Sequence, residues 1–338
     1  MKFGSLVLLF LMIWIGPALD ASAKDVVEYK MSLVVGPRGA WGEGAQRFID
    51  TVGAKSGGRI KIKPYYAGKL LAGKEINEFE LLKTGQADFA LGSAVNWSPK
   101  VEALNLFSLP FFFPTYKSLD AVTGGKAGRM LFDKMKREGV VCLGWGENGF
   151  REITNRVRPI AEPGDLKGLR IRVVGTALFR DTFKALGAEA KMMNWSEAQI
   201  AFQQGSVDGQ ENPVNVVVIP YRLWQYHKYI TLWRHAVDPL IMGVNAKTWK
   251  SFSSDERELI TQAAQEALAW EKAQAREGLT GEMAALKKLE AEGMQVIRLS
   301  EEQFKAFQEK VKDVWTQWTP KIGKGLVNTA LKEVESAR

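Results

Sequence analysis

Cysteine and histidine are scarce in this sequence of 338 residues. The single cysteine, Cys142, excludes a disulfide framework within the chain. Because His227 and His235 are the only histidines, a zinc cluster of Cys and His ligands is excluded too, whereas carboxylate sites for Mg²⁺ or Ca²⁺ stay open. Aromatic residues flank both histidines, so we expect these rings to pack in the core. No metal site is predicted from these residues.

The signatures of common catalytic sites are absent as well. The sequence contains no Gly-x-Ser-x-Gly elbow, no Gly-x-x-x-x-Gly-Lys-Ser/Thr phosphate loop and no His-Glu-x-x-His helix. Gly36, Gly39, Gly42 and Gly44 form a glycine-rich run, but their spacing differs from that of a dinucleotide site. We therefore predict neither catalytic residues nor a cofactor.

Long apolar runs are missing everywhere except near the N-terminus. There, Lys2 precedes an apolar run over residues 6–15, and the small-x-small triplet Ala21-Ser22-Ala23 follows. Such a run is too short to span about 30 Å of hydrocarbon as a helix. An uncleaved anchor is the alternative, but the pattern favours a signal peptide over residues 1–23 and a mature protein in the periplasm.

Composition and charge are those of a globular protein. Hydrophobic residues make up 46% and charged residues 25%, and the length suggests two domains, with one large α/β unit as the alternative. The formal net charge is +8, yet the basic residues are interleaved with acids, as in Glu256-Arg257-Glu258. A nucleic-acid interface would concentrate them, so we predict no nucleic-acid partner. A modest positive field still favours the arrival of small anions.

Strand and helix patterns alternate along the mature chain. The first five segments predict strand, helix, strand, helix and strand over residues 26–35, 41–54, 60–66, 76–85 and 88–91. This order predicts a sheet with parallel neighbours and helices on its faces. Residues 104–113 are dense in Leu, Phe and Pro and indicate a buried crossing rather than a surface loop.

The later segments continue the α/β pattern and end in an unusually long helical stretch. We expect helices over residues 118–136, 176–186 and 196–205, and strands over residues 140–145, 149–158, 169–174 and 232–244. The helical pattern from residue 254 to about residue 291 is nearly uninterrupted, which predicts a helix of about 54 Å running along both domains.

Arginines at predicted strand ends are the strongest candidates for chemistry. Alternation places Arg170 and Arg172 on one side of their strand, and Arg151 lies early in another. A rigidly held guanidinium binds a carboxylate through two parallel hydrogen bonds, which a lysine cannot do. Two exposed arginines on an edge strand are the alternative. The polar turn that follows adds Asn212, whose amide is a further donor for the same anion.

Several motifs together resemble a known family. The run Asp208-Gly209-Gln210-Glu211-Asn212-Pro213 with an upstream arginine is the most specific of them. The others lie, in the same order as in the family, at residues 48–56, 85–89, 107–111, 149–155, 165–173, 185–188 and 195–197. In these motifs the chain resembles the solute-binding proteins of TRAP (tripartite ATP-independent periplasmic) transporters, the DctP family.

The resemblance implies an α/β fold of the two-lobed periplasmic binding protein type. Each lobe would be a mixed sheet flanked by helices, and crossing strands and a long helix would join the two. We assign residues 24–148 and 237–276 to lobe I, and residues 149–236 and 277–338 to lobe II.

The resemblance also implies a set of ligand-binding residues in the cleft between the lobes. Arg172 matches the principal carboxylate-binding arginine, Arg151 a second arginine of the cleft, Asn212 the asparagine that supports the carboxylate, and Trp195 an apolar wall. The remaining positions in the predicted cleft are Ser93, Asn96, Trp97 and Trp41. The chain departs from many members at Val174, where they have proline, and in the aromatic character that Trp41 and Trp97 give the cleft.

The implied function is that of a receptor rather than an enzyme. It would bind a small organic acid as a monomer and deliver it to the membrane subunits of a TRAP transporter. Two alternatives remain at this point: an exported lyase or hydrolase acting on a carboxylate in the same cleft, and a ligand-sensing domain for a membrane sensor.

Overall fold

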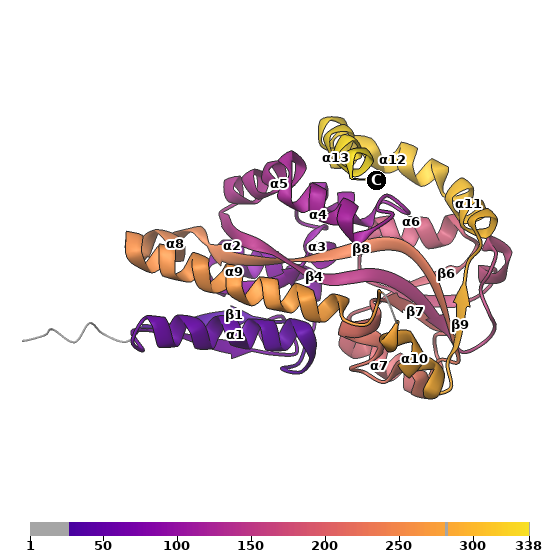
Figure 1. Ribbon diagram of the computed structural model, residues 1–338, viewed down its shortest axis with the longest axis horizontal. Coiled ribbons are helices and arrows are strands. Elements are labelled where there is room, and N and C mark those ends of the chain that lie inside the picture. Colours follow the sequence, from indigo (N-terminus) through magenta and orange to yellow (C-terminus); the bar gives the residue numbers. More distant parts are fainter. Residues whose placement is uncertain (1–26, 281–282, 338) are drawn as a thin grey trace, which may run out of the picture.

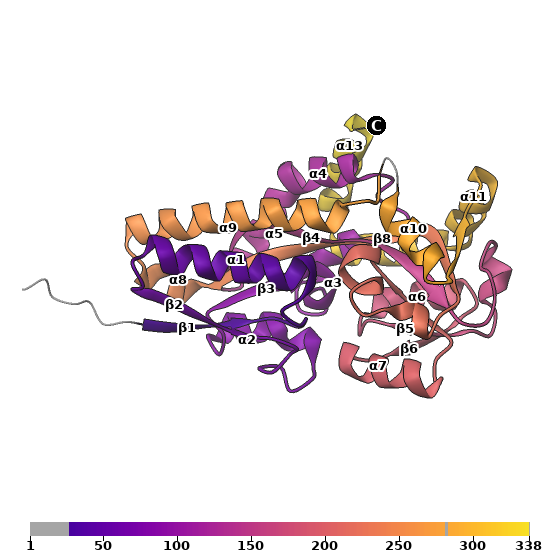
Figure 2. The same cartoon turned by 60° about the horizontal axis from the view of Figure 1, so that its bottom comes forward.

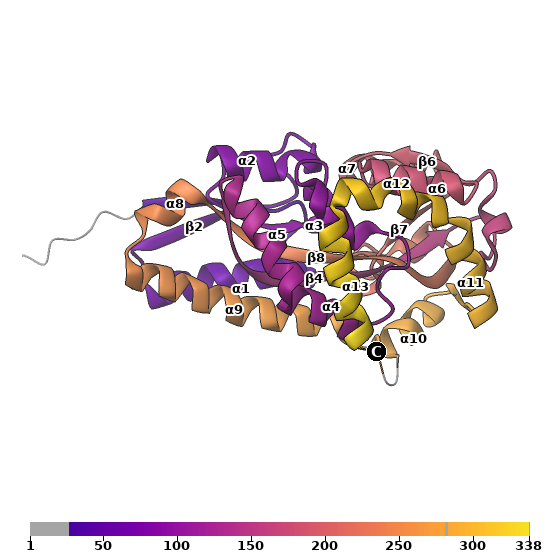
Figure 3. The same ribbon diagram turned by 90° about the horizontal axis from the view of Figure 1, so that it is seen from above.

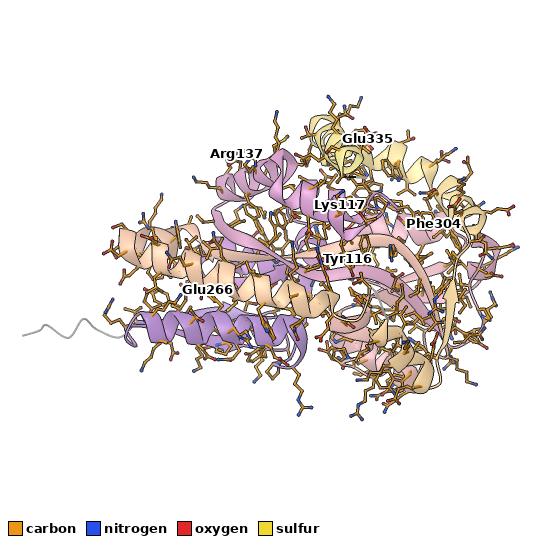
Figure 4. All side chains as sticks on the ribbon, in the orientation of Figure 1. Tyr116, Lys117, Arg137, Glu266, Phe304 and Glu335 are labelled. Atoms are coloured by element: carbon orange, nitrogen blue, oxygen red, sulfur yellow. The ribbon has the colours of Figure 1, made fainter. Side chains whose placement is uncertain are left out.

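The computed structural model describes residues 27–280 and 283–337. The predicted signal peptide lies outside these residues. Within them, none of the helices has the length and apolar character that crossing a bilayer demands. Long charged side chains such as Arg137, Glu266 and Glu335 project from the outer faces of their helices (Figure 4).

The first part of the chain forms the predicted parallel strands and their helices. The elements are β1 (Val27–Ser32), α1 (Gly39–Lys55), β2 (Ile60–Tyr65), η1 (Glu75–Asn77), α2 (Glu78–Thr84), β3 (Phe89–Ser93) and α3 (Ala94–Trp97). Strand β1 pairs in parallel with both β2 and β3. Helix α1 buries Ala45, Phe48 and Val52, which lie on one face at helical spacing. The predicted strand–helix alternation is confirmed here.

The single helix predicted over residues 118–136 consists of two helices in the structure. Residues 118–136 belong to α4 (Tyr116–Gly124) and α5 (Lys126–Arg137), which follow the buried 3₁₀ segment η2 (Glu102–Ser108). Gly125 separates them with an extended backbone (φ −88°, ψ −162°), and no other residue fits there because a Cβ would lie 2.4 Å from the Ala121 carbonyl oxygen. The Glu333 carboxylate accepts the amide hydrogens of Lys126 and Ala127 and so caps α5. The predicted buried crossing is confirmed, since Leu104, Leu106 and Leu109 have no exposed surface.

Two long antiparallel strands run through the whole molecule. Strand β4 (Val140–Asn155) unites the two strands predicted over residues 140–145 and 149–158, and β8 (Tyr229–Asn245) contains the one predicted over residues 232–244. Sixteen and seventeen residues at about 3.4 Å each extend for more than 50 Å. Irregularities in their pairing lie between Glu147 and Gly149 and between Arg151 and Ile153. These two strands lie in the middle of the sheet and belong to both of its halves (Figure 1).

The second part of the chain adds parallel strands to the far side of β4. Its elements are η3 (Pro163–Leu166), β5 (Arg170–Val173), α6 (Ala177–Ala185), β6 (Glu189–Met192), α7 (Trp195–Gln204), β7 (Gly209–Asn212), η4 (Val214–Val218) and η5 (Leu223–Gln225). Strand β5 pairs in parallel with β6 and β7, and β7 runs antiparallel to β4. The strand order is β2-β1-β3-β8-β4-β7-β5-β6, with β9 (Gln295–Arg298) on β8. The mixed α/β fold is as predicted, and the ladder is continuous through both halves.

The prediction of a single long helix from residue 254 to about residue 291 is wrong. After α8 (Ala246–Ser251), helix α9 (Ser254–Arg276) ends, and α10 (Ala284–Ala291) begins a separate helix. The break follows from Gly278, whose φ of +66° is unfavourable for other residues, and from Asn215, whose amide donates to the Ala275 and Glu277 carbonyls at the end of α9. Helix α9 lies beside α1 and along β4 (Figure 2).

Three helices close the chain: α11 (Glu301–Lys310), α12 (Lys312–Ile322) and α13 (Lys324–Ser336). They run from the second half of the molecule back over the first, where α13 packs against α4 and α5 (Figure 3). Helix α12 contacts both η2 and α6. The C-terminal segment thus touches both halves, and the lobe boundaries given above stay a prediction.

Candidate functional site

Residues from both halves of the sheet surround one cavity of about 410 Å³ of atom-free space. It lies where β3, β5 and β7 end and where β4 and β8 cross between the halves. The charged lining residues are Glu75, Arg151, Arg172 and Asp238, the uncharged polar ones are Ser93, Asn96, Asn148, Asn212 and Tyr221, and the apolar ones are Val34, Val35, Trp41, Val174, Trp195 and Val217. This mixture of charged, polar and apolar groups suits a small polar molecule.

Arg172 is the cation of the cavity with most of its donors free. Strand β5 holds it with only 1% of its surface exposed. Its Nε and Nη2 atoms donate to the Met193 carbonyl oxygen at 3.1 and 2.8 Å. The other three of its five N–H bonds find no acceptor among residues 27–280 and 283–337. Burial lowers the pKa of Arg172, but a guanidinium stays charged at any physiological pH.

Arg151 is equally buried, yet most of its donors are taken. Both its Nε and Nη2 atoms donate to the carboxylate of Glu211, and Nη2 donates in addition to Asn212 Oδ1 at 2.9 Å. On the other side, Nη1 donates to Asp238 Oδ2 at 3.3 Å. Burial opposes the charged form, but these two carboxylates outweigh it, and the pKa of Arg151 is raised. Two carboxylates therefore pair with this arginine before any ligand arrives.

Glu211 is held ionised by its surroundings. Burial raises its pKa, but the Arg151 charge and a contact of 3.0 Å with His235 Nε2 outweigh burial and lower it. His227 hydrogen-bonds Thr154 at 2.9 Å, and burial lowers the pKa of its imidazole to about 3. Both histidines thus pack in the core with one ring nitrogen bonded, as predicted.

Asp238 anchors the opposite wall of the cavity. Its carboxylate accepts hydrogen bonds from the Ser93 hydroxyl at 2.8 Å, the Val95 amide at 3.2 Å and Asn148 Nδ2 at 2.8 Å, in addition to Arg151. Burial raises the pKa of Asp238, while Arg151 and these hydrogen bonds oppose that change. A carboxylate with four donors has little capacity left for a ligand.

Glu75 connects the two halves across the cavity. Its Oε1 atom accepts the Trp195 amide hydrogen at 2.6 Å, and its Oε2 atom lies 4.0 Å from Arg172 Nη2. Burial raises the pKa of Glu75, with Arg172 opposing. The aromatic wall beside it consists of Trp195 and Tyr221, whose rings meet edge to face with centroids 4.9 Å apart.

Seven of the eight predicted binding residues line the cavity: Arg172, Arg151, Asn212, Trp195, Ser93, Asn96 and Trp41. Trp97 does not, which corrects the prediction. Its indole lies in the core, where Nε1 donates to Glu78 Oε2 at 3.1 Å and the ring packs against Phe79. Successive residues of a helix point about 100° apart, so Asn96 and Trp97 of α3 face different ways. The aromatic character of the cavity comes instead from Trp41, Trp195 and Tyr221.

Four polar lining residues were missed: Glu75, Asn148, Tyr221 and Asp238. Asp238 had a usable signal, because it is the only charged residue in the apolar run over residues 236–244. A charge in such a run is buried only with a partner. No comparable signal marks Glu75, whose position follows from tertiary packing. In residues 27–280 and 283–337, no group of three or more His, Cys, Asp or Glu side chains could hold a metal ion.

Comparisons with known proteins agree on one family. The family model "Bacterial extracellular solute-binding protein, family 7", DctP, matches residues 31–321. The C4-dicarboxylate-binding periplasmic protein DctP of Rhodobacter capsulatus is 29% identical over 307 residues, which are 90% of each chain.

Two solved structures are similar along nearly their whole length. A TRAP periplasmic solute-binding protein of Ralstonia eutropha with bound (S)-2-acetolactate superposes with a TM-score of 0.90 at 44% identity, covering 91% of this chain and 99% of the other. The sugar acid binding protein of Advenella mimigardefordensis with galactonate gives a TM-score of 0.86 at 29% identity, covering 93% and 99%.

Proposed function

The chain belongs to family 7 of the bacterial extracellular solute-binding proteins, the DctP family, and from that premise we propose that Arg172 binds the carboxylate of a small organic acid in the cavity between the two halves. Receptors of this family serve TRAP transporters in the periplasm. We place this protein among them, as the component that passes its ligand to the membrane subunits.

The observation that carries the proposal is the unsatisfied guanidinium of Arg172. An anion that leaves water loses several kcal/mol of hydration, and only a prepositioned cation with free donors offsets that loss. Arg172 meets this requirement, because the Met193 carbonyl fixes its plane and three N–H bonds remain free. Arg151 shapes the wall and keeps Asn212 and Asp238 in place. The ligands of the two similar structures, (S)-2-acetolactate and galactonate, both carry one carboxylate.

Capture requires the two halves to close over the ligand. Val34, Val35 and Trp41 come from the first half, and Val174, Trp195 and Val217 from the second. A ligand that touches both sets binds the closed arrangement better than an open one and therefore shifts the population toward closure. The membrane subunits would recognise that closed form.

Native mass spectrometry of the purified, undialysed protein tests the proposal. We expect a bound organic acid that is lost from Arg172→Ala. Mass analysis of the ligand after denaturation separates a receptor from an enzyme, because a receptor releases the acid unchanged, whereas a lyase or hydrolase releases products. Retention of the same acid by Arg172→Ala would refute the assignment.

A further inference from the structure

Glu75 is an acid at a site that has to receive an anion. It begins η1 in the first half of the chain, and only 10% of its side chain is exposed. The Trp195 amide fixes one carboxyl oxygen, which leaves the other 4.0 Å from the Arg172 guanidinium. The distance from Arg172 exceeds a hydrogen bond, so the second oxygen remains an acceptor without a donor.

The cavity wall offers one cation for a ligand carboxylate. Of its two arginines, Arg151 is already paired with both Glu211 and Asp238. Only Arg172 remains for the ligand, and Glu75 faces the same guanidinium. A second ligand carboxylate would meet Glu75 and Asp238 without a cation of its own, and like charges in a buried site repel strongly.

One acceptor in the cavity wall lacks a donor, namely the second carboxyl oxygen of Glu75. A largely buried acceptor without a donor is unfavourable, and a hydroxyl group on the ligand supplies that donor.

We propose that Glu75 is a specificity-determining residue that restricts the site to acids with a single carboxylate and at least one hydroxyl group. The inference rests on the proposed function, since it takes the ligand carboxylate to lie on Arg172. Val34, Val35 and Val217 then receive the uncharged remainder of the ligand.

Matched ligands separate the contributions of the hydroxyl and the second carboxylate. Butanoate, 2-hydroxybutanoate and malate share a skeleton of four carbons; the second adds a hydroxyl, and the third adds a terminal carboxylate as well. Galactonate and galactarate repeat the comparison of one carboxylate with two on a longer skeleton. Calorimetric titration of the protein freed of its copurified ligand gives the affinity for each acid.

The expected order is the same on both skeletons. We expect 2-hydroxybutanoate to bind at least tenfold more tightly than butanoate and than malate, which corresponds to about 1.4 kcal/mol. Galactonate should exceed galactarate by a similar factor. If the dicarboxylates bind as well as their partners, the inference is overturned while the proposed function stands. If no acid of either set binds, the proposed function and the inference fail together.

Two Glu→Gln variants test whether Glu75 causes the preference for acids with a single carboxylate. Glu75→Gln keeps the shape and one acceptor but removes the charge, so the preference for 2-hydroxybutanoate over malate should shrink at least fivefold. The control is Glu197→Gln, an exposed acid of α7 near the same arginine that lies outside the cavity lining, and here the preference should not change. The ratio is the measurement because structural damage lowers both affinities together. An unchanged ratio in Glu75→Gln would refute the role given to this residue.

Discussion

Replacing Arg172 by alanine should abolish most of the affinity for the organic acid. The side chain is buried, and the ligand carboxylate would then face Glu75 without a cation. Leaving one partner of a buried charge pair uncompensated costs about 2–5 kcal/mol, which is a loss in affinity of roughly 30-fold to several thousand-fold. Arg172→Ala also removes two hydrogen bonds from the Met193 carbonyl, so a thermal melt has to show that the variant is folded.

Arg172→Lys separates charge from geometry. An ammonium group cannot donate to Met193 and present a planar pair of donors to the ligand at the same time, so we expect binding markedly weaker than wild type. Arg170→Ala is the matched control on the same strand. Its side chain is 38% exposed, pairs with Asp208 and does not line the cavity. Its affinity for the acid should stay within about threefold of wild type.

Calorimetric titration of the three variants with the acid identified by mass spectrometry decides the matter. A folded Arg172→Ala that binds within about threefold of wild type, a difference under roughly 0.7 kcal/mol, would refute the placement of the carboxylate. Equal losses in Arg172→Ala and Arg170→Ala would show that both act through the stability of the strand.

Three further predictions concern closure, processing and pH. Small-angle scattering should show a smaller radius of gyration at saturating ligand, and an unchanged radius would contradict a hinged receptor. N-terminal sequencing of the exported protein should begin near Lys24, and retention of Met1 would contradict the signal peptide. Burial raises the pKa of Glu78 to about 8, so the unfolded state loses this proton first as the pH rises, and Tm should fall between about pH 5 and pH 8. Glu78→Gln should flatten that fall, and an equal fall in the variant would refute this cause.

Much of the fold could be predicted because the elements of the α/β layers are short and locally regular. The parallel strands and helix α1 follow from hydrophobic periodicity and from the glycines that end them. The sequence pattern predicts two strands, over residues 140–145 and 149–158, where the structure has the single strand β4 with glycines inside it. The structure shows why they are there: a Cβ at Gly144 would lie 2.8 Å from Leu268, and one at Gly146 2.7 Å from Glu271, so these glycines let α9 approach the strand.

The residues that line the cavity likewise include some that the sequence predicts and some that it does not. Those in sequence motifs could be placed in the cavity one by one, and the family resemblance ranks Arg172 above Arg151, but strand position alone does not distinguish the two. Both are buried arginines on strands. Their difference lies in distant partners, since Glu211 accepts from both Nε and Nη2 of Arg151, whereas the acceptors near Arg172 are the Met193 carbonyl and the more distant Glu75. Hydrogen-bond partners so far apart in the chain are set by tertiary packing, which periodicity does not reveal.

The anion site and the contact between the two halves are physically connected. Arg172 donates to the Met193 carbonyl, two residues before Trp195, whose amide donates to Glu75 in the opposite half. A hydrogen bond to a charged group contributes about 1.5–3 kcal/mol, whereas a shift from 1:99 to 99:1 in favour of closure requires about 5.5 kcal/mol. The contact with Glu75 therefore supports closure without enforcing it, and a ligand that adds its own contacts to both halves supplies the rest. We therefore expect Glu75, the proposed selector of the ligand, also to lower the free energy that the ligand must provide to close the receptor.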